Sequence, residues 1–394
     1  MTRRLAFLIL ALLSAAADAH AWEWDHTFEG VLTEGYRRYD RTNDTRFVSV
    51  YDTWGVFSSD QSVTQGPFAL EVKPELRFVL SQAVSADLDD PSRITLEPPP
   101  RHFDLETIFD KGSNRQLYAA VEKLSLAYSG ETAEIYVGRR PVSLGVLRTF
   151  PVWNKFTKPL PFQTALVQRS TSDGAGIRFQ TDRILLKALA VVGGDFERDG
   201  AYLLEATYFG SGFDALLLAG SWWEEKTLGA AFTTDVGGLG VKNEWIVFGA
   251  DKGGPDVEYQ NGTGFEYSFG EKFTALVEIL YLSQGVDTSR ERPLQLKTRF
   301  MPLSSRFYAY GNGSYKFTPL WTGTLGALAN LVDGSVYLMA STARSMSDDL
   351  DLTLDVNVPL GPDAAEFSQR SVFLRNDITL GFPLTAALAL KMAF

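Results

Sequence analysis

The chain closes with Leu388-Ala389-Leu390-Lys391-Met392-Ala393-Phe394, and this stretch decides which kind of fold to expect. Large apolar side chains stand at every second position, and alanine or lysine stands between them. A period of two is the geometry of a β-strand, in which successive side chains point to opposite faces. The stretch therefore predicts a strand with one face in apolar surroundings and the other beside smaller or polar groups.

The same alternation recurs along the chain. Over residues 67–80, apolar residues alternate with Glu71, Lys73, Glu75 and Arg77, and residues 350–360 follow the same pattern. Such segments are about ten residues long, which is the length of a tilted strand that crosses a membrane. We expect further strands over residues 27–37, 116–128, 133–144, 174–180, 184–192, 202–209, 213–223, 228–236, 239–248, 258–269, 273–281, 294–300, 306–312, 320–331, 335–343 and 371–381.

This repetition predicts an all-β fold, a transmembrane antiparallel up-and-down β-barrel of about eighteen strands, with about sixteen as the next choice. Two features leave the count open. Asn261-Gly262 and Asn312-Gly313 could be hairpin turns or bulges inside strands. Residues 46–56 could form a strand or a loop. An even number follows if both chain ends lie on the periplasmic side.

The beginning of the chain predicts an export signal. Two arginines precede an apolar run over residues 5–17, and Ala19-His20-Ala21 has the small-x-small pattern of a cleavage site. These features are typical of a secretory signal peptide, which we place at residues 1–21. The remaining chain, residues 22–394, is expected to form a single barrel domain.

The composition excludes several classes of protein. There are 37 Lys plus Arg against 48 Asp plus Glu, and the net charge of −11 argues against a nucleic-acid partner. Cysteine is absent, so stability is expected from the closed sheet and not from disulfides. Only three histidines occur, so we expect no His-rich metal site and no cofactor. The many aromatic residues suit girdles at the two membrane interfaces, with lipid as the partner.

Short and long connections are expected to alternate. Tight turns are predicted at Ser129-Gly130, Thr181-Asp182, Gly210-Ser211-Gly212, Gly237-Gly238, Gly270-Glu271 and Asp333-Gly334, because Gly and Asp supply the backbone freedom that turns require. We interpret these as the periplasmic hairpins. Longer connections, such as residues 195–200, 251–256 and 283–293, lie between them.

Two connections, residues 81–115 and 145–172, are too long for hairpin loops, and long loops are usually functional or disordered. The first is rich in acidic residues. Every fully charged side chain from residue 135 to residue 172 is positive. One interpretation is that the second loop folds into the lumen, where its cations favour anions. The alternatives are that they bind lipopolysaccharide phosphates outside, or pair with the acidic first loop. The candidate pore-lining residues here are Arg139, Arg140, Arg148, Lys155 and Lys158.

Charged residues on the polar face of predicted strands form a second group. In a barrel they face the lumen, where both signs of charge suggest a hydrated interior. The alternative is that such charges pair across strands without selecting any solute. The acidic members include Glu71, Glu75, Glu205 and Glu278, and the cations that we add to the candidate pore lining are Arg77, Arg178, Arg299 and Arg375.

The stretch Ile135-Tyr136-Val137-Gly138-Arg139-Arg140-Pro141-Val142-Ser143-Leu144-Gly145, followed by Phe150-Pro151 and Trp153-Asn154, resembles the strand-to-loop passage of alginate-export-type and related substrate-specific porins. The resemblance covers about twenty residues. It implies a bacterial outer-membrane porin with Arg139 and Arg140 near the constriction, and a small or polymeric anion such as a uronate as the solute. The terminal Phe394 resembles the signal that bacterial barrel-assembly machinery recognises, which implies that machinery as a partner.

The expected function is passive passage of small hydrophilic solutes, with anions as one candidate class. A barrel enzyme would require a nucleophile, a histidine and an acid within hydrogen-bond reach. Neither His26 nor His102 is followed by such a motif, so we expect no enzyme. The other alternative is a structural or export-partner barrel whose lumen is blocked.

Overall fold

The computed structural model describes residues 23–40, 47–81, 102–111, 115–156, 171–193, 200–223, 225–249, 257–285, 303, 305–362, 365–367 and 384–393. These residues form nineteen strands. The strands are β1 (Glu23–Asp40), β2 (Phe47–Gln65), β3 (Phe68–Ser81), β4 (Glu106–Lys111), β5 (Arg115–Ser129), β6 (Ala133–Pro141), β7 (Thr171–Gln180), β8 (Ile184–Val192), β9 (Ala201–Phe209), β10 (Phe213–Trp222), β11 (Glu225–Val236), β12 (Leu239–Phe248), β13 (Glu258–Phe269), β14 (Phe273–Leu282), β15 (Phe307–Thr318), β16 (Trp321–Asn330), β17 (Val336–Ser347), β18 (Leu350–Leu360) and β19 (Leu384–Ala393).

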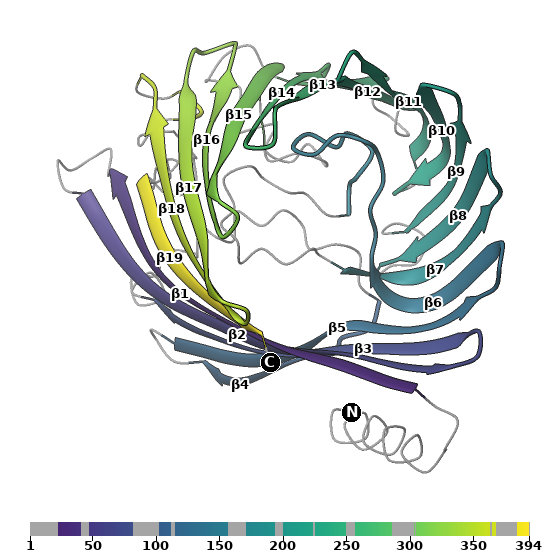
Figure 1. Ribbon diagram of the computed structural model, residues 1–394, viewed down its shortest axis with the longest axis horizontal. Coiled ribbons are helices and arrows are strands. Elements are labelled where there is room, and N and C mark those ends of the chain that lie inside the picture. The colour runs from purple at the N-terminus through teal and green to yellow at the C-terminus, as the bar shows by residue number, and fades with distance from the viewer. Residues whose placement is uncertain are drawn as a thin grey trace.

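Eighteen of these strands close into one antiparallel ring (Figure 1). β1 pairs with β2, β2 with β3 and β3 with β5; each later strand then pairs with the next up to β19, which returns to β1. β4 is the additional strand and pairs with β5. A closed ladder satisfies the backbone N–H and C=O groups without an open edge, which is the condition for crossing a bilayer with strands. The predicted antiparallel barrel of about eighteen strands is confirmed.

The alternation of side chains sorts each strand into an outer and an inner face. On β9, Leu204 is 63% exposed whereas its neighbour Leu203 is 3% exposed. The exposed residues of the ring include many large apolar side chains, such as Phe57, Leu217 and Leu325. An apolar outer surface of this kind meets lipid, so the side chains of the opposite parity face the interior. Within the described residues, no helix has the length and apolar character to cross a membrane.

The two ends of the ring differ in their connections. Turns of two or three residues join the strands at one end, where β1 also begins and β19 ends. Five of the six predicted turns lie there. Asp333-Gly334 is the exception and corrects our expectation, because it connects β16 to β17 at the opposite end. Turn residues have the same backbone requirements at both ends, so their chemistry cannot tell which end they occupy.

Several predicted boundaries change. Asn261-Gly262 and Asn312-Gly313 are neither turns nor bulges: they lie inside β13 and β15, and the pairing register runs through them unbroken. Residues 47–56 belong to β2, and part of the first long connection forms β4. The strands expected over residues 294–300 and 371–381 lie outside the described residues, and β14 pairs directly with β15 and β18 with β19.

Candidate functional site

The chain leaves the barrel wall where β6 ends at Pro141 and enters the interior. We call residues 142–156 the inward segment. Figure 1 shows this stretch leaving the wall beside β6 and β7 and crossing the ring toward the opposite strands. Its apolar side chains are buried in a cluster with inward-facing residues from strands between β8 and β17. Members of this cluster from the segment are Val142, Leu144, Phe150, Val152, Trp153 and Phe156.

Two glutamates on the opposite wall accept hydrogen bonds from the backbone of the inward segment. The carboxylate of Glu278 on β14 accepts from the N–H groups of Arg148, Thr149 and Phe150, each at 2.9 Å. The carboxylate of Glu244 on β12 accepts from the N–H of Val146 at 2.7 Å. Both glutamates are 0% exposed. Hydrogen bonds to a carboxylate are stronger than bonds between neutral groups. These bonds therefore hold the backbone of residues 146–150 against β12 and β14.

Glycines on the inner face of β13 leave room for the inward segment. A Cβ atom at Gly262 would lie 2.3 Å from a methyl carbon of Leu147 and 3.3 Å from the backbone oxygen of Phe150. A Cβ at Gly264 would lie 2.9 Å from the other Leu147 methyl. Glycine inside a strand often marks a close approach of another backbone. The Asn-Gly pair at 261–262 therefore serves packing and not a turn.

The last residues of the inward segment are held by side chains. The Nε1 of Trp153 donates to the backbone oxygen of Trp245 at 2.8 Å, and the ring of Phe156 lies 4.3 Å from that of Trp222, between centroids. The Nζ of Lys155 donates to Gln260 and lies 5.4 Å from the centre of the Phe248 ring. Lys155 is 2% exposed, so this predicted pore-lining cation is enclosed by protein.

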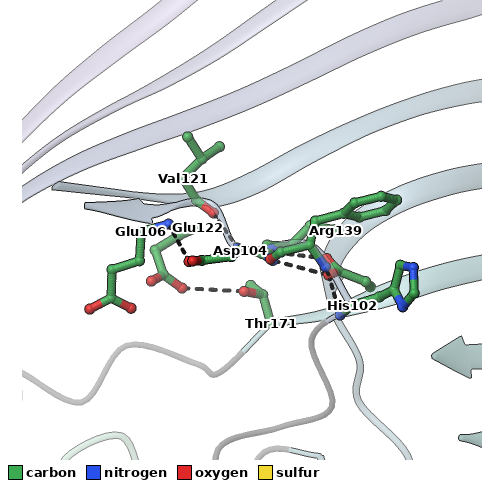
Figure 2. A network of polar contacts seen from close by, with 9 residues as sticks. His102, Asp104, Glu106, Val121, Glu122, Arg139 and Thr171 are labelled. Carbon is green, nitrogen blue, oxygen red and sulfur yellow. Dashed lines mark hydrogen bonds and ion pairs between the residues drawn. The ribbon is translucent and has the colours of Figure 1, made fainter. Parts of the chain in front are cut away.

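The two ends of the inward connection are joined by a buried ion pair (Figure 2). Arg139 on β6 and Asp173 on β7 are register partners, and the Nε of Arg139 donates to Oδ1 of Asp173 at 2.7 Å. The guanidinium also donates to the carbonyl groups of Val121, at 3.0 Å, and Phe103. Oδ2 of Asp173 accepts from the backbone N–H groups of His102 and Phe103, each at 2.8 Å. One pair thus connects β5, β6, β7 and the residues before β4.

Ion pairs cover the inner face of β2 to β6. Arg140 lies 3.2 Å from Glu71 and 2.9 Å from Glu134, whereas its neighbour Arg139 is 2% exposed and belongs to the wall. Lys123 on β5 lies 3.0 Å from the same Glu71. The carboxylates and cations here keep a fifth or more of their side chains exposed, apart from Glu71 at 18%. Charges with this exposure are hydrated.

A second group of ion pairs lies on β3 and β5, farther from the short-turn end of the barrel. Arg77 pairs with Glu75 and, at 3.0 Å, with Glu122, which accepts from the hydroxyl of Thr171 at 3.2 Å. β5 carries a bulge here, because Lys73 pairs with Lys123 and Pro74 with Val121. The extra residue, Glu122, therefore joins the same set of inward charges as Lys123.

The inward segment places one cation beside another. Arg148 lies 3.0 Å from Glu266 on β13, and Lys242 on β12 lies 3.3 Å from the same carboxylate. The side chain of Arg148 is 61% exposed. Arg148 and Lys242 therefore share one carboxylate next to the anchored part of the segment, and the guanidinium of Arg148 stays exposed in the interior.

The remaining predicted cations are separate from this group. Arg178 donates to Gln180 near the short-turn end. Lys158, Arg299 and Arg375 lie outside the described residues. Glu244, Lys242 and Glu266 are site residues that were not predicted from the sequence. Alternation along residues 239–248 and 258–269 could have placed all three on inner faces, but it does not show that they lie beside a segment from another part of the chain.

Comparisons with known proteins agree with this architecture. No family model and no curated protein sequence matches the chain. Among solved structures, OccAB3 of Acinetobacter baumannii has a TM-score of 0.57 at 11% identity and covers 94% of this chain and 99% of its own. OccK3 (OpdO) of Pseudomonas aeruginosa has a TM-score of 0.56 at 10% identity, covering 94% and 96%.

The outer membrane protein OpdK of Pseudomonas aeruginosa is similar as well. Its TM-score is 0.54 at 12% identity, with 94% of this chain and 98% of that chain covered. Another structure of OpdK, solved with vanillate, is 13% identical with the same TM-score. The alginate-export-type resemblance stays a prediction. Over nearly its whole length, the chain shares the fold of these solved barrels.

Proposed function

We propose that the chain is a bacterial outer-membrane channel for the passive passage of small hydrophilic solutes, with a preference for anions. The observation that carries this proposal is the position of Arg148, whose side chain is 61% exposed on the inward segment and shares the carboxylate of Glu266 with Lys242. An exposed cation inside a low-dielectric wall attracts anions and concentrates them locally.

The charged inner face of β2 to β6 supports a hydrated path. Glu71, Lys123 and Arg140 form a connected set of opposite charges, all partly exposed. Such a face stabilises water and polar solutes in the interior, whereas an apolar face would exclude them. The solute path therefore runs beside this face, opposite the wall against which the inward segment packs.

The solute class follows from the same charges. The exposed guanidinium of Arg148 suits a carboxylate, because planar guanidinium groups bind carboxylates in two-point geometry. Vanillate, which is present in a structure of OpdK, is a small aromatic carboxylate. We propose small carboxylates, aromatic ones among them, as the first solutes to test on this chain.

The two ends of the chain suggest how the protein reaches the outer membrane. We infer that residues 1–21 are a signal peptide, that the barrel-assembly machinery recognises the C-terminal strand, and that lipopolysaccharide surrounds the outer leaflet. Phe394 itself lies outside the described residues.

Planar-bilayer recording of the protein purified from membranes tests the function. We expect steady conductance with a reversal potential that shows anion preference in a KCl gradient, and a shift of that potential toward zero in Arg148→Ala. Arg344→Ala is the matched control. It removes the same charge from the face of β17 that also carries the exposed Leu338 and Met346. Cation preference in the unmodified protein would contradict the anion preference.

The same recording decides between the channel and the two alternatives. A barrel with a blocked lumen would give no steady open level. We propose no enzymatic role for the histidines: His26 lies between the rings of Trp24 and Phe28, at centroid distances of 5.6 and 5.7 Å. A lipase activity that disappears in His102→Ala would overturn this part of the proposal.

A further inference from the structure

We propose that Glu278 and Glu244 are positioning residues that determine where the inward segment crosses the interior, and through it the size and charge selectivity of the passage. The inference rests on the channel function proposed above. Neither carboxylate needs to touch the solute, because both act through the backbone of residues 146–150.

The first support is the number of donors that converge on Glu278. Three successive backbone N–H groups, those of Arg148, Thr149 and Phe150, point at one carboxylate that is 0% exposed. Consecutive N–H groups form an anion-binding concavity in this arrangement. Here the wall of the barrel supplies the anion, so the segment is held by a carboxylate from a strand far away in the sequence.

The second support is the fit of the turn around Glu244. Gly145 has a φ of 86°, a conformation that glycine adopts without strain. A Cβ atom at this position would lie 2.4 Å from Oε2 of Glu244. The turn can therefore approach the carboxylate only with glycine at residue 145. The contact of Val146 with the same oxygen follows directly after it.

The third support is that the carboxylates hold the part of the segment that carries Arg148. The later residues have attachments of their own, through Trp153 to Trp245 and through Lys155 to Gln260. Removal of Glu278 would leave the three N–H groups without this acceptor, while those later attachments remain. The expected result is a local release of residues 146–150 in an intact barrel. Arg148 would then lose its fixed position beside Lys242.

The test compares Glu278→Ala, Glu278→Gln and Glu244→Ala with the unmodified protein, all purified from membranes as complete barrels. Glu205→Gln is the matched control, because Glu205 is another buried inward glutamate but is paired with Lys187 on the neighbouring strand. We expect additional conductance levels and a reversal potential closer to zero for Glu278→Ala. The glutamine variant should show a smaller change, because its amide oxygen still accepts. Glu205→Gln should resemble the unmodified protein.

A reversible cross-link separates positioning from a direct effect of charge. The chain has no cysteine, so Leu147→Cys with Gly262→Cys introduces a single possible disulfide. The positions are close enough, since a Cβ at residue 262 lies 2.3 Å from a Leu147 methyl. Added to Glu278→Ala, the oxidised cross-link should restore the original conductance and selectivity, and reduction should remove them again. No restoration, or unaltered channels in Glu278→Ala, would overturn the proposal.

Limited trypsin digestion reports the position of the inward segment independently of any conductance measurement. We expect the unmodified barrel to resist cleavage after Arg148, and Glu278→Ala to be cut there while the strands stay folded. Silent unmodified barrels together with this difference in cleavage would overturn the channel function and leave the positioning intact. Equal resistance at Arg148 in both proteins would overturn the positioning itself.

Discussion

The two halves of the inner face use the same strand geometry for opposite purposes. From β2 to β6 the inward positions carry connected ion pairs, such as Glu71 with Lys123 and Arg140, which keep part of their surface in water. From β10 to β16 the inward positions are largely apolar and buried, as at Leu218, Ile246 and Leu280. Figure 1 shows the inward segment crossing to this second half.

The difference shows what the inward segment contributes. An inward position is hydrated where nothing covers it and forms part of a core where the segment packs on it. The segment therefore divides one closed wall into a charged side, from β2 to β6, and a packed side that holds the segment in place.

Trp153→Ala should produce the largest loss of stability. Its side chain is 0% exposed within the packed side and donates to the backbone of Trp245. Large-to-small changes of this type cost about 3–5 kcal/mol. Denaturant titration followed by the electrophoretic mobility of folded and unfolded barrel measures the change. Trp321→Ala, at a 40% exposed position, is the control and should lose less stability. Equal losses of stability would contradict the role of Trp153 in the packed side.

Arg139→Ala should come next, because it leaves the carboxylate of Asp173 buried without its cation. Breaking a buried ion pair costs about 3 kcal/mol or more. The same titration measures the loss. A double variant, Arg139→Met with Asp173→Leu, should recover most of it, since no unpaired charge remains. A single variant as stable as the unmodified protein would show that the pair does not hold the ends of the inward connection.

Gly262→Ala should have an intermediate effect. The new Cβ would meet Leu147 at 2.3 Å, and overpacking of this kind costs about 1–3 kcal/mol. Gly311→Ala is the matched control, because a Cβ there has only the backbone oxygen of Leu276 within 4 Å, at 3.9 Å. Trypsin cleavage after Arg148 should increase in Gly262→Ala and not in the control. The opposite order would mean that the glycine does not make room for the segment.

Arg140→Ala should have the smallest effect on stability. Its ion pairs are partly exposed, and such pairs contribute about 0–1 kcal/mol. The variant should nonetheless change the conductance, because it removes a cation from the charged side. A loss as large as that of the adjacent Arg139→Ala would remove the distinction between the buried ion pair of the wall and the partly exposed ion pairs of the charged side.

Much of the fold could be predicted from the alternation of residues. The strands Ile184–Val192, Leu239–Phe248 and Glu258–Phe269 have the expected bounds, because the turn residues at 181–182, 237–238 and 270–271 delimit them. The Asn-Gly pair at 261–262 was ambiguous for a physical reason. Glycine permits both a turn and a close approach, and only the position of Leu147 shows which one applies.

The candidate site could be predicted only in part. Arg139 and Arg140 are adjacent and carry the same charge, yet one is buried in the wall and the other pairs with Glu71. Strand parity alone would place them on opposite faces, but it does not identify their partners. Asp173, Phe103 and Val121 come from three other parts of the chain, and only the folded barrel brings them to one guanidinium.

The sequence by itself determined the membrane-barrel architecture, since a period of two in polarity specifies strands with one apolar face and closure follows from the need to pair every backbone group. The tertiary structure decided which inward residues meet water and which meet protein. That choice depends on contacts between residues about a hundred positions apart or more, such as Arg148 with Glu278, and no local pattern contains them.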